Sequence, residues 1–156
     1  MTVFVPLTLD AARQLRTVGS ARDLVGYAAG PGLRTWLSEA RLDDEEADYV
    51  ALNHAGVAAL TLDDTAPTRI VLAVDRDVAD GDDLGAVTVA QLDWVAVRSL
   101  FADEGAAASA VLAARAAVRG SDLAAALSAP AVEALQESYD LLWYAPDELD
   151  ALPAPT

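Results

Sequence analysis

The sequence predicts an α/β fold in which a mixed sheet of about five strands packs against several helices. The chain has 156 residues, close to the usual size of one domain, and 54% of them are hydrophobic while 22% are charged, as in folded proteins. Strand-like and helical segments alternate in the first half, which favours a largely parallel sheet. We expect a single globular domain over residues 1–152 and a frayed tail at 153–156.

Segments rich in β-branched, aromatic or continuous apolar residues are expected to form the strands. They are residues 2–7, 24–29, 69–74, 92–101 and 141–144, with a shorter extended piece at 86–89. The run at 69–74 reads RIVLAV, and a continuous apolar run of this length is typical of a strand covered on both faces. We therefore place it at the centre of the sheet.

Capping residues bound the first helix, because Thr8 is placed to cap its start and Gly19 to stop it after Val18. The acidic run at 43–46 favours the start of a helix that continues to Leu62, since the helix dipole stabilises negative charge there. Other helices are predicted from Pro31 to Ser38, over 105–118, just after Ser121 and from Pro130 to Ser138, and a last acidic turn begins at Pro146.

The chain is strongly acidic, with 25 Asp and Glu against 10 basic residues and a formal net charge of −15. Residues 37–83 carry thirteen acids, and residues 120–156 carry seven acids and no base. This charge argues against a nucleic-acid partner, since binding a phosphate backbone requires Lys or Arg to replace its counterions. An acidic surface favours solubility and can attract a basic protein partner. Association of the chain with itself into a homo-oligomer is also compatible with the sequence.

The chain contains no cysteine, which excludes disulfides, thiolate metal sites and thiol nucleophiles and favours a reducing compartment. Its first residues lack the basic and apolar regions of a signal peptide. The longest uncharged run, residues 49–62, is too short and too polar to span a bilayer. We expect a cytoplasmic protein that has no cofactor and does not contact a membrane.

A turn at Gly30, Pro31 and Gly32 is the first candidate site. Its backbone N–H groups, together with the guanidinium of Arg34 in the following helical turn, could bind an anionic ligand. A dinucleotide fingerprint would need a third glycine where Thr35 stands. The simpler interpretation of Gly-Pro-Gly is a turn that starts a helix.

Two aspartates, Asp75 and Asp77, follow the central predicted strand and could hold a divalent metal through their carboxylates. The spacing of the loop at 75–83 does not match a calcium loop, and no further ligand can be named nearby. A solvated acidic loop is the favoured interpretation.

The aromatic residues and the lone histidine have ordinary structural interpretations. His54 is expected to be half-buried and hydrogen-bonded, because no nucleophile motif accompanies it. We expect the aromatic residues to lie in the core or half-buried on the sheet, although an exposed Trp143–Tyr144 pair could anchor a partner. These residues are Trp36, Trp94, Trp143, Tyr27 and Tyr144.

Three segments, VFVPLTL at the start, RIVLAVD in the middle and DLLWYAPDEL near the end, resemble a family of short actinobacterial proteins catalogued only as a domain of unknown function. The resemblance covers almost the whole chain. It implies an intracellular domain that stands alone, and it implies no activity, ligand or site residue.

No catalytic constellation emerges from these residues, so the leading hypothesis is a non-enzymatic protein-interaction or regulatory module with an acidic surface. Asp147, Glu148 and Asp150 lie beyond the last predicted strand and are the candidate partner-binding residues. The alternative is a domain or enzyme that binds an anionic ligand at Gly30, Gly32 and Arg34, aided by a metal at Asp75 and Asp77.

Overall fold

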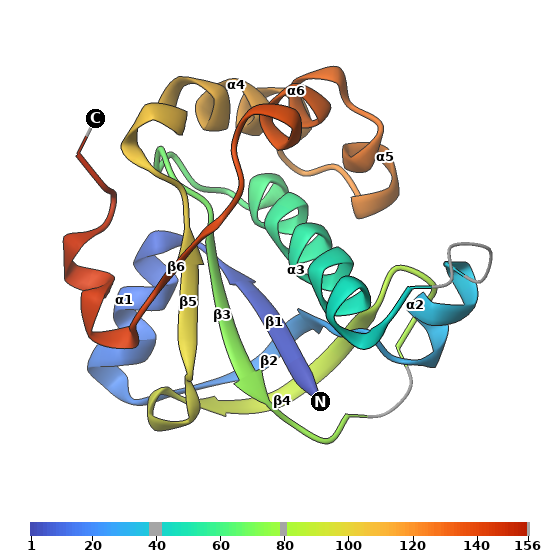
Figure 1. The fold of residues 1–156 in the computed structure, drawn as a ribbon. Helices are drawn as coiled ribbons and strands as arrows, with labels where there is room; N and C mark the ends of the chain where they lie inside the picture. Colours follow the sequence, from blue (N-terminus) through green and yellow to red (C-terminus); the bar gives the residue numbers. More distant parts are fainter. Residues whose placement is uncertain (38–41, 79–80, 156) are drawn as a thin grey trace.

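The computed structural model describes residues 1–37, 42–78 and 81–155, and these residues form a six-stranded open sheet. Helices lie on both faces of the sheet (Figure 1). The strand order is β4-β2-β1-β3-β5-β6. The strands are β1 (Thr2–Leu7), β2 (Ser20–Tyr27), β3 (Ile70–Asp75), β4 (Ala86–Asp93), β5 (Ser99–Ala102) and β6 (Leu142–Tyr144). The predicted α/β class is confirmed.

The expectation of a largely parallel sheet is wrong, because every neighbouring pair of strands is antiparallel. β2 and β3 both run antiparallel to β1, so these two strands point the same way, as in a βαβ crossover. However, β1 lies between them. The alternation of strands and helices correctly indicates a crossover but does not reveal the strand inserted into it.

Helix boundaries follow the capping signals closely. The longer helices are α1 (Leu9–Val18), α3 (Asp44–Thr61), α4 (Ala108–Val118) and α6 (Pro130–Ser138), and the short ones are α2 (Pro31–Trp36) and α5 (Leu123–Leu127). Three 3-10 turns are η1 (Trp94–Ala96), η2 (Gly105–Ala107) and η3 (Pro146–Ala151). Thr8 caps α1 through Ala11 N, and Gly19 ends it in the left-handed region, as predicted. None of the described helices is long and apolar enough to cross a membrane.

Helix α3 lies between two layers (Figure 1). One side packs on the sheet through Ala47, Ala51, Ala55 and Ala58. The other side packs through Val57 and Leu60 against α4, α5 and α6. Small alanine side chains let the helix approach the sheet closely, and burial on two sides explains why α3 has no polar face along most of its length. Helix α1 and η3 cover the opposite face of the sheet.

The single strand predicted at 92–101 is wrong. Leu92 and Asp93 end β4, η1 turns the chain, and Ser99 begins β5. The side chain of Val95, in the middle of this turn, is 93% exposed, so the apolar residues of this segment do not form a buried strand. As a result, β4 lies at one edge of the sheet and β5 near the other.

The first turn of α2 packs tightly against the loop before β4. A Cβ atom at Gly32 would lie within 2.6 Å of the carbonyl oxygen of Gly81 and closer still to that of Asp82. A Cβ atom at Gly30, two residues earlier, would meet nothing within 4 Å. The two glycines of the predicted motif therefore have different roles, and only Gly32 is required by packing.

We expect Gly32→Ala to destabilise the protein by about 1–3 kcal/mol, because the added methyl group forces two backbone segments apart. Gly30→Ala is the matched control and should change the free energy of unfolding by less than about 1 kcal/mol. Alanine lowers the conformational entropy of the unfolded chain, which stabilises the protein, but it is a poorer N-cap residue than glycine, which destabilises it. Urea unfolding of both variants measures the difference. Equal effects of the two substitutions would contradict the packing argument.

Candidate functional site

The predicted anion-binding turn is occupied by groups of the chain itself. Arg34 Nε donates to the carbonyl of Ala29 at 3.0 Å, and Arg34 Nη2 lies 2.7 Å from Asp44 Oδ1. Gly32 faces the carbonyl oxygens of the neighbouring loop, which repel an anion. The three predicted residues belong to one turn but do not converge on an open space. An anionic ligand would have to displace Asp44 from Arg34.

Asp75 and Asp77 lie at the end of β3 with different surroundings. Asp75 ends the strand, and its Oδ2 contacts Nη1 of Arg98 in an exposed ion pair. Asp77 is exposed two residues further on. Across the described ranges, no three His, Asp or Glu side chains are grouped so that they could hold a metal ion. Within the described residues, the Asp75 carboxylate is thus paired with Arg98 and is not grouped with further metal ligands.

The three C-terminal acids lie in or beside η3. Glu148 Oε2 accepts a hydrogen bond from Ala145 N at 2.7 Å, and Asp150 Oδ1 lies 2.7 Å from Arg16 Nη1 on α1. Asp147 is exposed. Two of the three predicted partner-binding residues thus already stabilise the C-terminal segment, which the buried Leu149 anchors in the core.

His54 is almost completely buried and links α3 to the loop before β4. Its Nδ1 lies 2.8 Å from the carbonyl of Leu84, and its ring and that of Trp36 form a T-shaped pair with centroids 5.6 Å apart. Burial lowers the pKa of His54, while the bond to Leu84 and the charge of Asp82 oppose this shift. The prediction of a hydrogen-bonded structural histidine agrees with these contacts, but His54 is 5% exposed and is therefore buried, not half-buried as expected.

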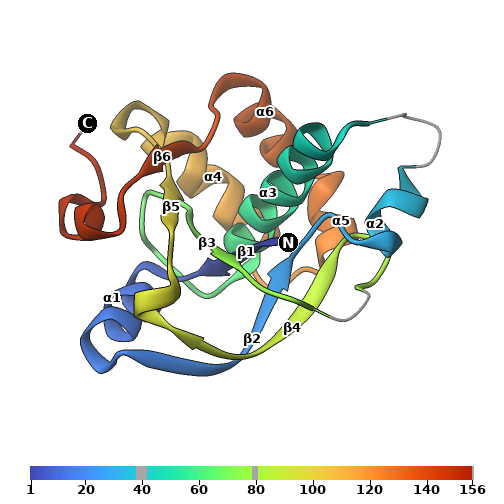
Figure 2. The ribbon, with the colours of Figure 1, turned by 60° about the horizontal axis from the view of Figure 1, so that its bottom comes forward.

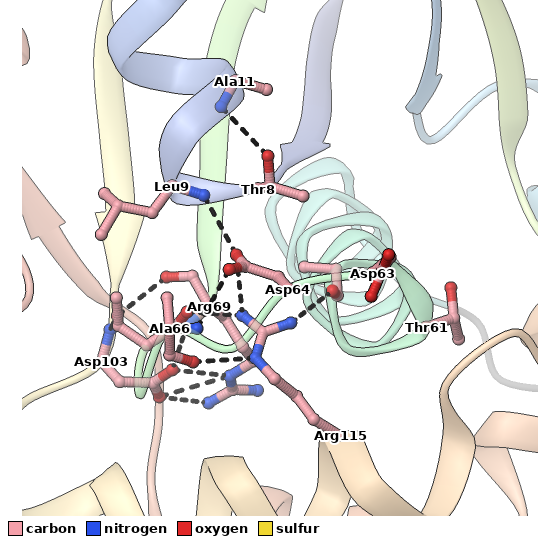
Figure 3. Close-up of polar contacts among 12 residues, drawn as sticks. Thr8, Leu9, Ala11, Thr61, Asp63, Asp64, Ala66, Arg69, Asp103 and Arg115 are labelled. Carbon is pink, nitrogen blue, oxygen red and sulfur yellow. Dashed lines mark hydrogen bonds and ion pairs between the residues drawn. The ribbon is translucent and has the colours of Figure 1, made fainter.

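The most concentrated polar cluster is buried and was missed by sequence reasoning (Figure 3). Arg69 and Asp103 are each 1% exposed and form a two-pronged ion pair, with Arg69 Nη2 2.7 Å from Oδ1 and Nε 3.0 Å from Oδ2. The backbone N–H of Arg69 also donates to Asp103 at 2.8 Å. Thr68 Oγ1 accepts from Asp103 N at 2.9 Å. These contacts tie the start of β3 to the end of β5.

Arg115 of α4 completes the cluster from the other side. It is 1% exposed, and its guanidinium donates to the carbonyls of Ala59, Ala66 and Thr68 at 2.7–2.9 Å. Asp64 Oδ2 lies 3.6 Å from Arg115 Nη2 and also accepts from Leu9 N. Burial lowers the pKa of Arg115, while the charges of Asp64 and Asp103 oppose this shift.

This cluster cannot hold a ligand, because its charged groups are buried and bonded to one another and to backbone carbonyls. Its role is to connect β3, β5, α3 and α4. The available sequence signals are weak: Arg69 stands at the head of an apolar run, and Arg115 stands in an alanine-rich helix with no acid one turn away.

A second cluster lies at the surface, in a cleft of about 380 Å³ over β1, β3, β5 and β6. Its aromatic walls are Phe4, Phe101 and Trp143, and the rings of Phe4 and Phe101 meet edge to face at 6.1 Å. Arg98 lines the same cleft and pairs with Asp75, the residue that follows the lining residue Val74. The cleft combines aromatic faces, which attract cations, with a carboxylate that an arginine already pairs.

Trp143 is 61% exposed, so the expectation that it lies in the core or half-buried on the sheet is wrong. It belongs to β6, a three-residue strand whose neighbour in the described sheet is β5. Leu142 beside it is 40% exposed and points to the opposite face. Apolar side chains are therefore exposed on both faces of an edge strand, whereas Tyr27, another predicted core aromatic, is buried as expected.

We expect Asp103→Asn to destabilise the protein by about 3–5 kcal/mol, because Arg69 would keep its charge in the interior without a charged partner. Asp75→Asn removes a carboxylate from an exposed ion pair and should cost less than about 1 kcal/mol. Chemical unfolding of the two variants at pH 7 compares them directly. Similar losses would show that the buried pair does not carry the stability assigned to it.

His54 should make stability depend on pH. The unfolded chain binds a proton near the ordinary histidine pKa of about 6.5, and the folded protein resists protonation until a lower pH. The contribution of neutral His54 is therefore complete above pH 6.5 and is lost as the pH falls through the folded pKa. Between pH 7.5 and pH 5.5, the free energy of unfolding should fall more in the native protein than in His54→Gln. Identical changes in both proteins would refute this role.

Comparison with known proteins shows a relationship at the level of sequence alone. No curated protein and no solved structure matches the chain. A family model described as "Family of unknown function (DUF6912)" matches residues 1–152, which is almost the whole chain. The resemblance of the three sequence segments to a family of unknown function is thereby confirmed, and the chain belongs to this family.

Proposed function

We propose that this protein is a non-enzymatic interaction module that binds a basic, extended segment of a partner protein along β6. The observation that carries the proposal is Trp143, which is 61% exposed on an edge strand and forms a wall of the aromatic cleft. Exposed tryptophans are enriched among residues that dominate binding energy, since they bury a large area at low entropic cost.

The backbone of β6 supports an extended partner. An edge strand presents unpaired N–H and C=O groups, and an added strand satisfies them while its alternate side chains enter pockets on one face. In β6, Trp143 faces the cleft, and Leu142 and Tyr144 face the other side. A partner strand beside β6 would thus place one of its side chains next to Trp143 and over the cleft.

Charge selects a basic partner. Residues 120–156, which include β6, carry seven acids and no base, and Asp140 lies just before the strand, bonded to the hydroxyl of Tyr49 at 3.0 Å. A second copy of the chain would bring another formal charge of −15 to this surface, which opposes association. A partner with Lys or Arg at alternate positions gains both attraction and strand pairing.

The aromatic cleft offers a place for one cationic side chain of the partner. Phe101 and Trp143 line the cleft, and Arg98, which also lines it, pairs with Asp75. An incoming Arg or Lys would contact the rings and compete with Arg98 for Asp75. Arg98 therefore acts as an internal competitor of the partner.

The direct test uses a labelled, unstructured peptide that alternates Arg with Thr and Val, with Glu in place of Arg in the control peptide. We expect the basic peptide to bind and Trp143→Ala to weaken binding at least tenfold, or about 1.4 kcal/mol. Trp36→Ala is the matched control, because Trp36 is 52% exposed on α2, far from β6 (Figure 1). Fluorescence anisotropy gives the affinities, and equal effects of the two tryptophan variants would overturn the proposal.

Two further variants separate the cleft from general electrostatics. Arg98→Ala should strengthen peptide binding more than Arg22→Ala does, since both remove one positive charge but only Arg98 occupies the cleft. Asp75→Asn should weaken binding more than Asp77→Asn, since only Asp75 lies beside Arg98. If the paired variants behave alike, the peptide responds to net charge and the cleft is not its site.

A further inference from the structure

The sheet contains a seam between β1 and β2. These two strands share one residue pair, Phe4 with Tyr27, whereas β1 and β3 share six pairs and β2 and β4 share seven. At Gly26 the strands touch closely, because a Cβ atom there would lie 2.5 Å from Val3 Cγ1. Before this point β2 turns away from β1 together with β4 (Figure 2).

The backbone itself holds the seam open. On the β1 side, Pro6 has no N–H and cannot supply the donor with which a strand extends a ladder. On the β2 side, Asp23 has a φ of 57°, in the left-handed region that interrupts an extended strand. Each strand thus carries a local feature that opposes pairing, and both features lie at the place where pairing is missing.

A pocket of about 410 Å³ fills this seam. Pro6 and Leu7 line it from β1, Leu24 and Val25 from β2, and Ala58 and Leu62 from the end of α3. Val25 is 53% exposed at its wall, so the pocket opens to solvent. Its volume lies in the range of small-molecule sites, which are mostly apolar with a few polar groups.

The polar groups of the seam pocket define the ligand. Thr8 Oγ1 already accepts from Ala11 N, and Thr61 Oγ1 already donates to the carbonyl of Ala58. Asp23 is the one ionisable carboxylate in the lining, and no arginine lines this pocket among the described residues. An apolar chamber with a single carboxylate at an exposed edge favours a cationic end and repels an anionic one.

We propose that the seam pocket binds a compact apolar molecule that carries an amine. The apolar body occupies the space between β1, β2 and α3, and the amine bonds to the carboxylate of Asp23. This site is separate from the β6 cleft and does not depend on the proposed interaction with a basic segment.

Three probes with one apolar body test the proposal: 1-adamantanamine, 1-adamantanol and 1-adamantanecarboxylate. In methyl NMR spectra of the full chain, the amine should shift the signals of Leu7, Leu24 and Val25. It should bind at least tenfold more tightly than the alcohol, and the carboxylate should bind more weakly than the alcohol. No shift with any probe at millimolar concentration, or equal affinity for amine and carboxylate, overturns the proposal.

Two variants identify the site. Asp23→Asn keeps a residue that tolerates the left-handed backbone and should reduce the amine to the affinity of the alcohol. Ala11→Leu fills the pocket from α1 and should weaken the binding of the amine and of the alcohol. Ala116→Leu, on the exposed side of α4, should leave the affinities of these two probes unchanged. Trp143→Ala should leave amine binding unchanged. An amine that keeps its full affinity in both Asp23→Asn and Ala11→Leu binds elsewhere, and the proposal is then wrong.

Discussion

The buried ion pair between Arg69 and Asp103, extended by Arg115, is the interaction on which the arrangement of the layers depends (Figure 3). Helix α3 has no basic residue in its last turn, and the carbonyl of Ala59 near its end is buried. Arg115 reaches this carbonyl from α4 and also bonds two carbonyls of the connection to β3. The positive charge that stabilises the C-terminal end of α3 therefore comes from another helix. Docking of α4 on α3 satisfies groups that neither helix could satisfy alone.

The local parts of the fold could be predicted from the sequence because their causes are local. Thr8 and Gly19 bound α1, the acidic run begins α3, and Pro130 begins α6, each through a bond or a dihedral angle within one helical turn. Strand direction could not be predicted, since it depends on β1 lying between β2 and β3. The break at η1 was hidden for a similar reason, because an apolar residue such as Val95 gives no sign that it will be exposed.

The candidate site was predictable only in part. Asp75 was singled out by its position after the central strand, but its partner Arg98 follows 23 residues later and comes close only through the pairing of β3 with β5. The sequence favours a core or half-buried position for Trp143 and leaves an exposed Trp143–Tyr144 pair as the alternative, because a tryptophan in a strand commonly packs on the sheet. Its exposure results from the shortness of β6 and from its place at the edge of the sheet, which are properties of the fold and not of the segment.

The two surface hollows have a common origin in the way α3 covers the sheet. A single helix spans a width of about 10–12 Å, while neighbouring strands lie about 4.8 Å apart, so one helix covers two or three strands. In a sheet of six strands, part of the face on which α3 packs is therefore left bare. On one side of α3 the bare region is the aromatic cleft, which extends over β1, β3, β5 and β6, and beside the C-terminal turn of α3 it is the seam between β1 and β2. Helices α4, α5 and α6 stack on α3. A second helix beside α3 on the same face of the sheet would have covered the cleft or the seam pocket. Because α4, α5 and α6 stack on α3 instead, both hollows stay open to solvent.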